Sequence, residues 1–207
     1  MNSRGWRVAE AFLLIAGLAL LDWYIWVRAG GVVRQAWESW LFRREVHETR
    51  VKLHRQPALA PPRLRKGDLV GRLEIPRLNL VVMVKEGSDA DTLEGAAGHL
   101  PSSPVPGFPG NVAVAAHRDT FFRPLRNLRV HDLIRFSTLR GAFEYEVESL
   151  KIVRPVDVSV LRASEENTLT LVTCYPFYYV GPAPERFIVR ARQVAAPPLV
   201  ERASLQR

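Results

Sequence analysis

The single cysteine of this 207-residue chain, Cys174, has the sequence surroundings of a nucleophile. It ends an apolar, β-branched run that begins at Thr168, and Arg186 follows a short distance downstream. A second apolar run, Asn111–Ala116, ends immediately before His117. A thiol, an imidazole and a guanidinium at strand ends supply a nucleophile, a general acid/base and an oxyanion stabiliser for acyl transfer through a thioester. The pattern therefore favours an enzyme.

Each of these side chains also has an ordinary explanation, because lone cysteines are often buried apolar residues and most histidines are structural. His99 belongs to a Gly/Pro-rich stretch and is expected to lie in a loop, whereas His131 is expected at a turn. His47 and His54 fall in the N-terminal part of the chain. Thr173 precedes the cysteine, so its hydroxyl or amide is a weaker candidate for the site. No Cys/His spacing typical of a metal site occurs, and we expect neither a metal nor a cofactor.

The positive charge of the chain is concentrated in its N-terminal part. The whole sequence carries a net charge of +8, but residues 1–66 hold 12 Lys/Arg against 5 Asp/Glu, whereas residues 67–207 hold 17 against 16. A nucleic-acid-binding domain is expected to keep positive charge on its own folded surface. The nearly neutral C-terminal part therefore argues against nucleic acid as a partner.

Residues 8–27 are mostly apolar and long enough to cross a bilayer at ~1.5 Å per residue. Glu10 and Asp22 lie near the ends of this stretch, where a carboxylate can reach water. No small-residue cleavage site follows the apolar run, which favours an uncleaved anchor over a removed signal peptide. We expect residues 1–30 to form a tail and a transmembrane helix, with a buried N-terminal helix as the alternative.

Three further segments are expected after this anchor. Residues 31–66 combine an amphipathic juxtamembrane helix with a Pro-rich linker, because apolar residues recur there at helical spacing before prolines end the pattern. Residues 67–194 form the folded domain. Residues 195–207 are expected to be a disordered tail.

The domain from residue 67 onward is predicted to be all-β, because alternating and short apolar runs replace the helical pattern. No long amphipathic helix occurs there, which argues against a doubly wound α/β fold. Short helices are expected at Asp91–Ala97 and Phe121–Leu128. Strands are expected at Leu69–Ile75, Leu78–Val84, Asn111–Ala116, Leu133–Thr138, Ala142–Val153, Thr168–Cys174 and Arg186–Val194. This series of short strands favours a closed barrel or a sandwich.

The motifs around these candidate residues resemble the sortase family. Thr170–Cys174 is similar to the TLxTC signature of sortases, and Gly98–Val112 resembles the family's Gly/Pro-rich loop and the strand after it. His117 then falls on the family's histidine position and Arg186 on its arginine position. The stretch Cys174–Phe177, together with the N-terminal anchor, is most similar to class D sortases.

The resemblance implies a closed sortase-type β-barrel of about eight strands with short helices, preceded by the transmembrane helix. It implies a transpeptidase that cleaves an LPXTG-like sorting signal after its threonine, forms a thioester at Cys174 and transfers the acyl group to an amine. His117 would be the acid/base, and Arg186 would steady the substrate or the oxyanion. Arg118 and Tyr175 join Thr173 as weaker candidates for substrate binding. The partners would be proteins carrying the sorting signal, and an amine from a peptidoglycan precursor or a pilin lysine.

The resemblance and the flanking charges disagree about topology. More arginines follow the apolar span than precede it, so the positive-inside rule favours a cytoplasmic domain. The resemblance is to exported enzymes, and we therefore expect a single-pass protein of the cell membrane with an extracytoplasmic catalytic domain. Ala116 stands where many family members have glycine. Residues 153–167 lack an acidic cluster, so activation by calcium is not expected.

Two other functions remain as alternatives. One is a different cysteine acyl transferase, such as an L,D-transpeptidase of peptidoglycan, although the Ser-His-Gly-Cys signature of those enzymes is absent. The other is a non-enzymatic anchored β-barrel that binds a peptide. Such a barrel would tolerate Cys174→Ser without loss of function, whereas the enzyme would not.

Overall fold

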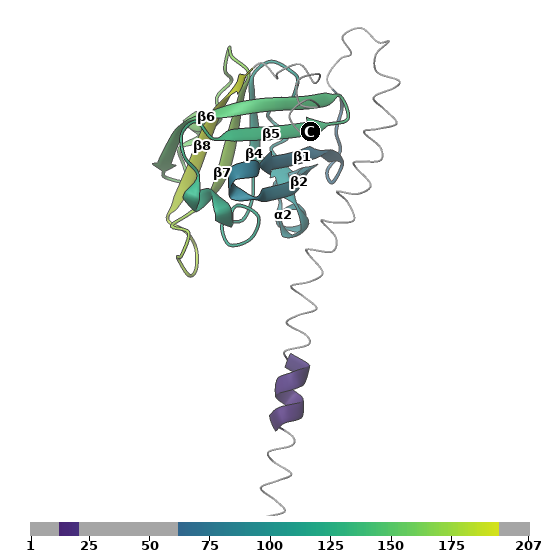
Figure 1. Ribbon diagram of the computed structural model, residues 1–207, viewed down its shortest axis with the longest axis vertical. Helices are drawn as coiled ribbons and strands as arrows, with labels where there is room; N and C mark the ends of the chain where they lie inside the picture. Colours follow the sequence, from purple (N-terminus) through teal and green to yellow (C-terminus); the bar gives the residue numbers. More distant parts are fainter. Residues whose placement is uncertain (1–12, 21–61, 195–207) are drawn as a thin grey trace, which may run out of the picture.

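The computed structural model describes residues 13–20 and 62–194, and the latter form a closed barrel with strand order β1-β2-β3-β4-β7-β8-β6-β5 (Figure 1). The strands are β1 (Leu69–Ile75), β2 (Leu80–Glu86), β3 (Ala97–His99), β4 (Asn111–Ala115), β5 (Leu133–Thr138), β6 (Gly141–Val153), β7 (Thr168–Tyr175) and β8 (Glu185–Val194). The helical elements that accompany them are short: α2 (Ala90–Gly95), η1 (Pro76–Leu78), η2 (Arg123–Asn127) and η3 (Val158–Leu161). The all-β barrel predicted from the sequence is confirmed.

The N-terminal predictions fall largely on residues that the structure does not describe. Residues 13–20 are helical. Within the described part of the chain, no helix is long and apolar enough to span a membrane. The predicted transmembrane segment extends beyond residues 13–20 on both sides. Most of the 31–66 segment and the whole of the 195–207 tail also lie outside the described residues.

The sequence prediction missed one strand, β3. This strand has only three residues, and it pairs in parallel with β2 and antiparallel with β4. Gly98 lets β3 lie against the Gly87 carbonyl, because a Cβ on Gly98 would be 2.1 Å from that oxygen. The expectation that His99 lies in a loop is therefore wrong: His99 is the last residue of β3 and is buried. A strand this short has too few residues to display an alternating pattern.

The barrel interior is a single apolar cluster to which all eight strands contribute. Side chains of a strand alternate between the two faces of a sheet, and one face of each strand supplies this cluster. From β4 it receives Val112 and Val114, and from β7 it receives Leu169 and Leu171. The rings of Phe122 and Phe136 are fully buried in the same cluster. Because this core fixes which side chains point inward, it also fixes which residues line the outside of the barrel wall.

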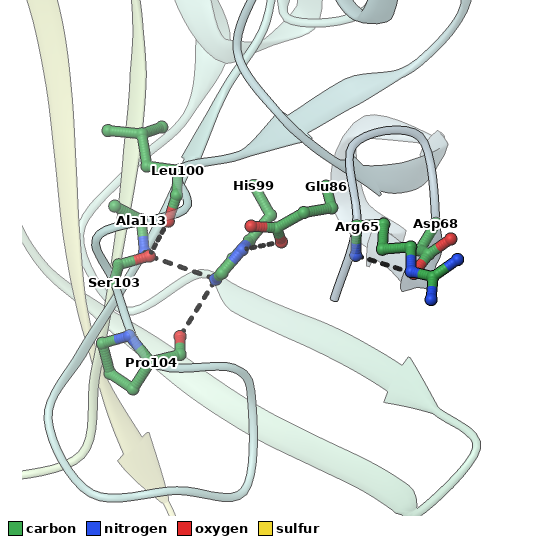
Figure 2. Close-up of polar contacts among 8 residues, drawn as sticks. All are labelled: Arg65, Asp68, Glu86, His99, Leu100, Ser103, Pro104 and Ala113. Carbon is green, nitrogen blue, oxygen red and sulfur yellow. Dashed lines mark hydrogen bonds and ion pairs between the residues drawn. The ribbon is translucent and has the colours of Figure 1, made fainter. Parts of the chain in front are cut away.

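A buried polar cluster joins β2 and β3 to the loop before β4 (Figure 2). His99 Nδ1 lies 2.6 Å from Glu86 Oε2, and the two side chains are only 2% and 8% exposed. His99 Nε2 lies 3.0 Å from the Pro104 carbonyl oxygen and 3.1 Å from the Ser103 hydroxyl oxygen. The same Ser103 oxygen accepts a hydrogen bond from the Ala113 amide in β4. The cluster therefore connects three neighbouring strands and their loop away from water.

Loss of His99 is expected to destabilise the barrel strongly. His99→Ala leaves the buried Glu86 carboxylate without its imidazole partner, so we expect the free energy of unfolding to fall by about 3 kcal/mol. Pulse proteolysis of the full chain in urea measures this change, because the protease digests molecules whose barrel is unfolded and leaves the folded barrel intact.

A second histidine–glutamate pair provides the control. His131 Nδ1 also lies 2.6 Å from a carboxylate oxygen, that of Glu146, but these side chains are 80% and 32% exposed. His131→Ala should cost less than about 1 kcal/mol, because exposed pairs contribute little. Equal losses for the two variants would show that burial does not determine the contribution of His99.

Candidate active site

The parallel pairing of β4 with β7 begins at a buried asparagine. Asn111 lies opposite Thr168, and its side-chain oxygen accepts hydrogen bonds from the hydroxyls of Thr168 at 3.2 Å and Thr170 at 2.7 Å. Its amide nitrogen donates to the carbonyls of Val160 and Arg162 in the β6–β7 connection. Because all its polar groups are used, Asn111 fixes the register of the two strands and holds the connection against them.

At the other end of the pair, β4 and β7 deliver the predicted base and nucleophile side by side. The Ala116 amide donates to the Val172 carbonyl, and the buried Thr173 hydroxyl donates to the Ala116 carbonyl at 2.7 Å. The next residues along the two chains are His117 and Cys174. Thr173 therefore has a clear structural role, because its hydroxyl satisfies the carbonyl of Ala116, the residue directly after β4.

Arg186 approaches Cys174 from the opposite side. In the antiparallel pairing of β7 with β8, Cys174 is directly opposite Arg186. The Nη1 group of Arg186 donates to the carbonyls of Ala183 at 3.2 Å and Glu185 at 2.9 Å. Among the described residues no hydrogen bond is formed by its Nε or Nη2. The guanidinium is thus held at the strand end with donors left for another group.

The three side chains share the outer face of the barrel wall. Leu169 and Leu171 of β7 point into the core, so by alternation Cys174 points outward. By the same alternation in β4 and the residues after it, the His117 side chain also points outward. Arg186 points outward as well, because it lies directly opposite Cys174 and residues directly opposite one another share a face of the sheet. Cys174 is half-buried and His117 is exposed. A nucleophile, a base and a cation therefore lie next to one another on a surface that a substrate can reach.

The chain after His117 is anchored by buried apolar side chains. The Phe122 amide donates to the His117 carbonyl at 3.0 Å, closing a turn, and the Phe122 ring is fully buried. Leu125 in η2 is fully buried as well. This anchoring fixes the backbone of His117 while its side chain remains exposed.

Tyr175 lies in an aromatic cluster beside the site. Its ring centroid is 5.9 Å from that of Phe177 and 6.3 Å from that of Phe187, and the Phe177 and Phe187 centroids are 5.2 Å apart. Phe177 and Phe187 pack against the barrel core. The three rings therefore support the ends of β7 and β8, from which Cys174 and Arg186 project.

Arg118, the other weaker candidate, contacts the β7–β8 loop, residues 176–184. Its Nη2 donates to the carbonyls of Tyr179 at 2.6 Å and Gly181 at 3.0 Å, and its guanidinium carbon lies 5.9 Å from the Tyr179 ring centroid. A second contact, from Arg126 to the Tyr178 hydroxyl at 2.7 Å, was not anticipated from the sequence. These long-range contacts tie the segment after His117 to the loop after the cysteine strand.

These residues can perform acyl transfer without an additional group. A thiolate can attack a carbonyl, an imidazole can move the proton, and a guanidinium can stabilise the oxyanion. Within the described part of the chain, no group of three or more His, Cys, Asp or Glu side chains is arranged to hold a metal ion. The role of Asn111 was also missed by sequence reasoning; an asparagine at the start of an apolar run was its only signal.

Removal of the Arg118 side chain is expected to release the β7–β8 loop before any substrate is added. Arg118→Ala removes two charge-assisted hydrogen bonds, so local opening should become easier by about 1–2 kcal/mol. Chymotrypsin should then cut at Tyr178 or Tyr179 about tenfold faster. Arg123→Ala, which alters an exposed arginine of the same segment, is the control. If the Arg118 variant were cleaved at the wild-type rate, Arg118 would not hold the loop, and contact with substrate would be its main role.

Comparisons with known proteins place the folded part of the chain in one family. Residues 73–194 match the family model of the sortase domain. Sortase D of Bacillus subtilis (strain 168) is 41% identical over 129 residues, which cover 62% of this chain and 65% of that protein. A sortase D5 transpeptidase of Clostridium perfringens has a similar structure, with a TM-score of 0.61, 28% identity, and coverage of 74% of this chain and 94% of the other.

A second similar structure includes a sorting motif. It is sortase C of Clostridium perfringens with the C-terminal cell wall sorting motif, at a TM-score of 0.60 and 25% identity, covering 75% of this chain and 88% of the other. The family model covers more than half of the chain, and the barrel, the signature and the solved structures agree with it. The chain therefore belongs to the sortase family, whose members are cysteine transpeptidases, and it resembles the class D members of that family.

Proposed function

We propose that this protein is a membrane-anchored transpeptidase that cleaves an LPXTG-like sorting signal after its threonine and transfers the acyl group to an amine. The observation that carries the proposal is the arrangement around Cys174, with the end of β4 on one side and Arg186 on the other. Family membership supports the same reaction class. His117 is exposed and Cys174 is half-buried, so a substrate can reach both side chains from solvent.

In the first half of the reaction, the Cys174 thiolate attacks the carbonyl carbon of the signal's threonine. The free donors of Arg186 hold the oxyanion of the tetrahedral intermediate or the adjacent peptide carbonyls. As the C–N bond breaks, imidazolium from His117 gives its proton to the leaving amine. The product is a thioester between the threonine acyl group and Cys174.

In the second half, an amine attacks the thioester carbon and the C–S bond breaks. His117, now neutral, takes the proton from the attacking amine, and the thiolate is regenerated. The acceptor that we propose is an amine of a peptidoglycan precursor or of a pilin lysine. The similarity to a sortase C whose structure was solved with the C-terminal cell wall sorting motif supports a sorting-signal peptide as the acyl donor.

We also propose that residues 8–27 anchor the protein in the cell membrane with the barrel outside the cytoplasm. The length and apolar character of this segment support the anchor. Acceptors at the cell wall would require the extracytoplasmic side. A membrane-impermeant maleimide added to intact cells should therefore label Cys174, and complete protection until the cells are lysed would contradict this topology.

The reaction is tested with the full chain in detergent, mixed with LPXTG-like and LPXTA-like peptides and a primary amine. We expect an acyl adduct on Cys174 without the amine and a transpeptidation product with it, both detected by intact-mass and peptide-mapping mass spectrometry. Cys174→Ala and His117→Ala should abolish both. Arg186→Lys retains the charge but loses the guanidinium geometry, and should slow the reaction about 100-fold.

The control for this series is His131→Ala, which removes an exposed imidazole remote from Cys174 in the sequence and paired with Glu146. It should leave the reaction unchanged. A thiol that alkylates readily but forms no adduct with any sorting peptide would contradict the substrate class. Unchanged peptide binding by Cys174→Ser, with no product from the wild type, would identify a binding protein instead.

A further inference from the structure

The segment between His117 and β5 carries four arginines whose guanidinium groups form no ion pair among the described residues. Arg118, Arg123, Arg126 and Arg129 lie in it, and its two acidic residues are Asp119 and Asp132. The Asp132 carboxylate forms its ion pair with Arg77, which lies outside the segment. Arg118 and Arg126 bind neutral groups, carbonyls and a tyrosine hydroxyl, so their charge is not neutralised.

Next to this segment, the β7–β8 loop exposes apolar surface. Tyr178 is 73% exposed, Tyr179 is 47% exposed and Val180 is 95% exposed. Residues 175–184 contain no charged side chain. An almost fully exposed valine between a tyrosine and a glycine has no folding role of its own, because it buries nothing.

The arginines and the apolar loop form one surface. The Arg126 guanidinium donates to the Tyr178 hydroxyl at 2.7 Å and lies 5.3 Å from the centre of its ring. Arg126 and Arg129 also line an open hollow with Arg77 and Pro124. In Figure 1 the β7–β8 loop, in yellow-green, projects beyond the end of the barrel close to the η2 segment in green. We call this surface the arginine–tyrosine face: Arg123, Arg126, Arg129, Tyr178, Tyr179 and Val180.

We propose that the arginine–tyrosine face docks on an anionic phospholipid surface. Guanidinium groups bind headgroup phosphates bidentately, and tyrosine rings are favoured at the boundary between headgroups and acyl chains. Val180 at the tip of the loop enters the apolar side of that boundary, while Arg123 and Arg129 contact phosphates. Docking brings the end of β7, and with it Cys174, close to the membrane surface. Docking of this face does not depend on the acyl-transfer chemistry at Cys174.

The exposed apolar tip distinguishes a bilayer from a soluble anionic polymer. A polyanion would bind the arginines but would gain nothing from Val180, because it offers no apolar layer. A bilayer uses both parts of the face at the same time. The combination of unpaired arginines with an uncharged aromatic loop therefore favours the lipid surface.

The test must detect the face itself, because residues 8–27 of the full chain can bind any vesicle. Hydroxyl-radical footprinting provides a local signal, since it measures the solvent access of individual side chains. The full chain is compared on phosphatidylcholine vesicles and on phosphatidylcholine/phosphatidylglycerol vesicles at equal lipid concentration. We expect oxidation of Tyr178 and Tyr179 to fall only on the anionic vesicles, whereas Phe108 in the loop before β4 is unchanged.

Two variants separate the contributions. Each arginine near an anionic bilayer contributes a factor of about five in binding, so the double variant R123Q/R129Q should weaken docking about 25-fold and abolish the protection. Val180→Asp should abolish it as well. Neither variant alters Cys174 or its neighbours, so a small maleimide should alkylate the half-buried Cys174 at the wild-type rate if the fold is intact, and faster if the barrel has unfolded.

Three results would overturn the proposal. One is equal protection of the tyrosines on neutral and anionic vesicles. Another is protection on anionic vesicles that survives in Val180→Asp. The third is protection of the tyrosines by soluble polyphosphate that equals their protection on anionic vesicles. If R123Q/R129Q abolished this protection and Val180→Asp did not, an anionic polymer would be identified as the partner.

Discussion

The parallel pairing of β4 with β7 is the constraint on which the rest of the structure depends. Parallel neighbours are joined only through long connections, so nothing local in the chain fixes their register. Here the register is fixed by polar contacts at both ends: the buried Asn111 with its two threonines at the start, and the Thr173 hydroxyl with the Ala116 carbonyl at the finish. A shift of one residue would turn Cys174 towards the core. The positions of the nucleophile and the base are thus both set by the alignment of β4 with β7.

The remaining parts of the site are attached to this alignment. β8 pairs with the whole length of β7 and brings Arg186 opposite Cys174. Phe122, buried in the core, holds the chain that follows His117. Arg118 then connects that chain to the loop between β7 and β8. Catalytic side chains at exposed strand ends are therefore supported by buried residues and by loop contacts, which is the arrangement that a precise site requires.

The sequence predicted most of the barrel because its strands carry their own signals. The bounds of β1 and β5 agree with the prediction, and the longer strands β6, β7 and β8 differ by one residue at one end. The short strand β3 was missed because its three residues are defined by pairing and by the buried His99–Glu86 contact, which are non-local. Pairing and burial of this kind depend on tertiary structure and leave little trace in a local pattern.

The candidate site was predictable in its residue types but not in its geometry. Cys174, His117 and Arg186 could be selected because thiols, imidazoles and guanidiniums at strand ends carry chemistry. That they share one outer face follows only from the β4–β7–β8 order. The loop contacts of Arg118 and Arg126 join residues that are far apart in the sequence, and no spacing rule would have found them.

The strand alignment is tested most directly by a cross-link between position 117 and Cys174. Because Cys174 is the only cysteine, His117→Cys creates a single pair of thiols in the full chain. We expect dibromobimane, which fluoresces when both of its arms react with neighbouring thiols, to bridge this pair in the folded protein. Arg140→Cys, in the turn between β5 and β6, should give no bridge. Free alkylation of both thiols of the His117→Cys variant, without a bridge, would contradict the β4–β7 alignment and the active site built on it.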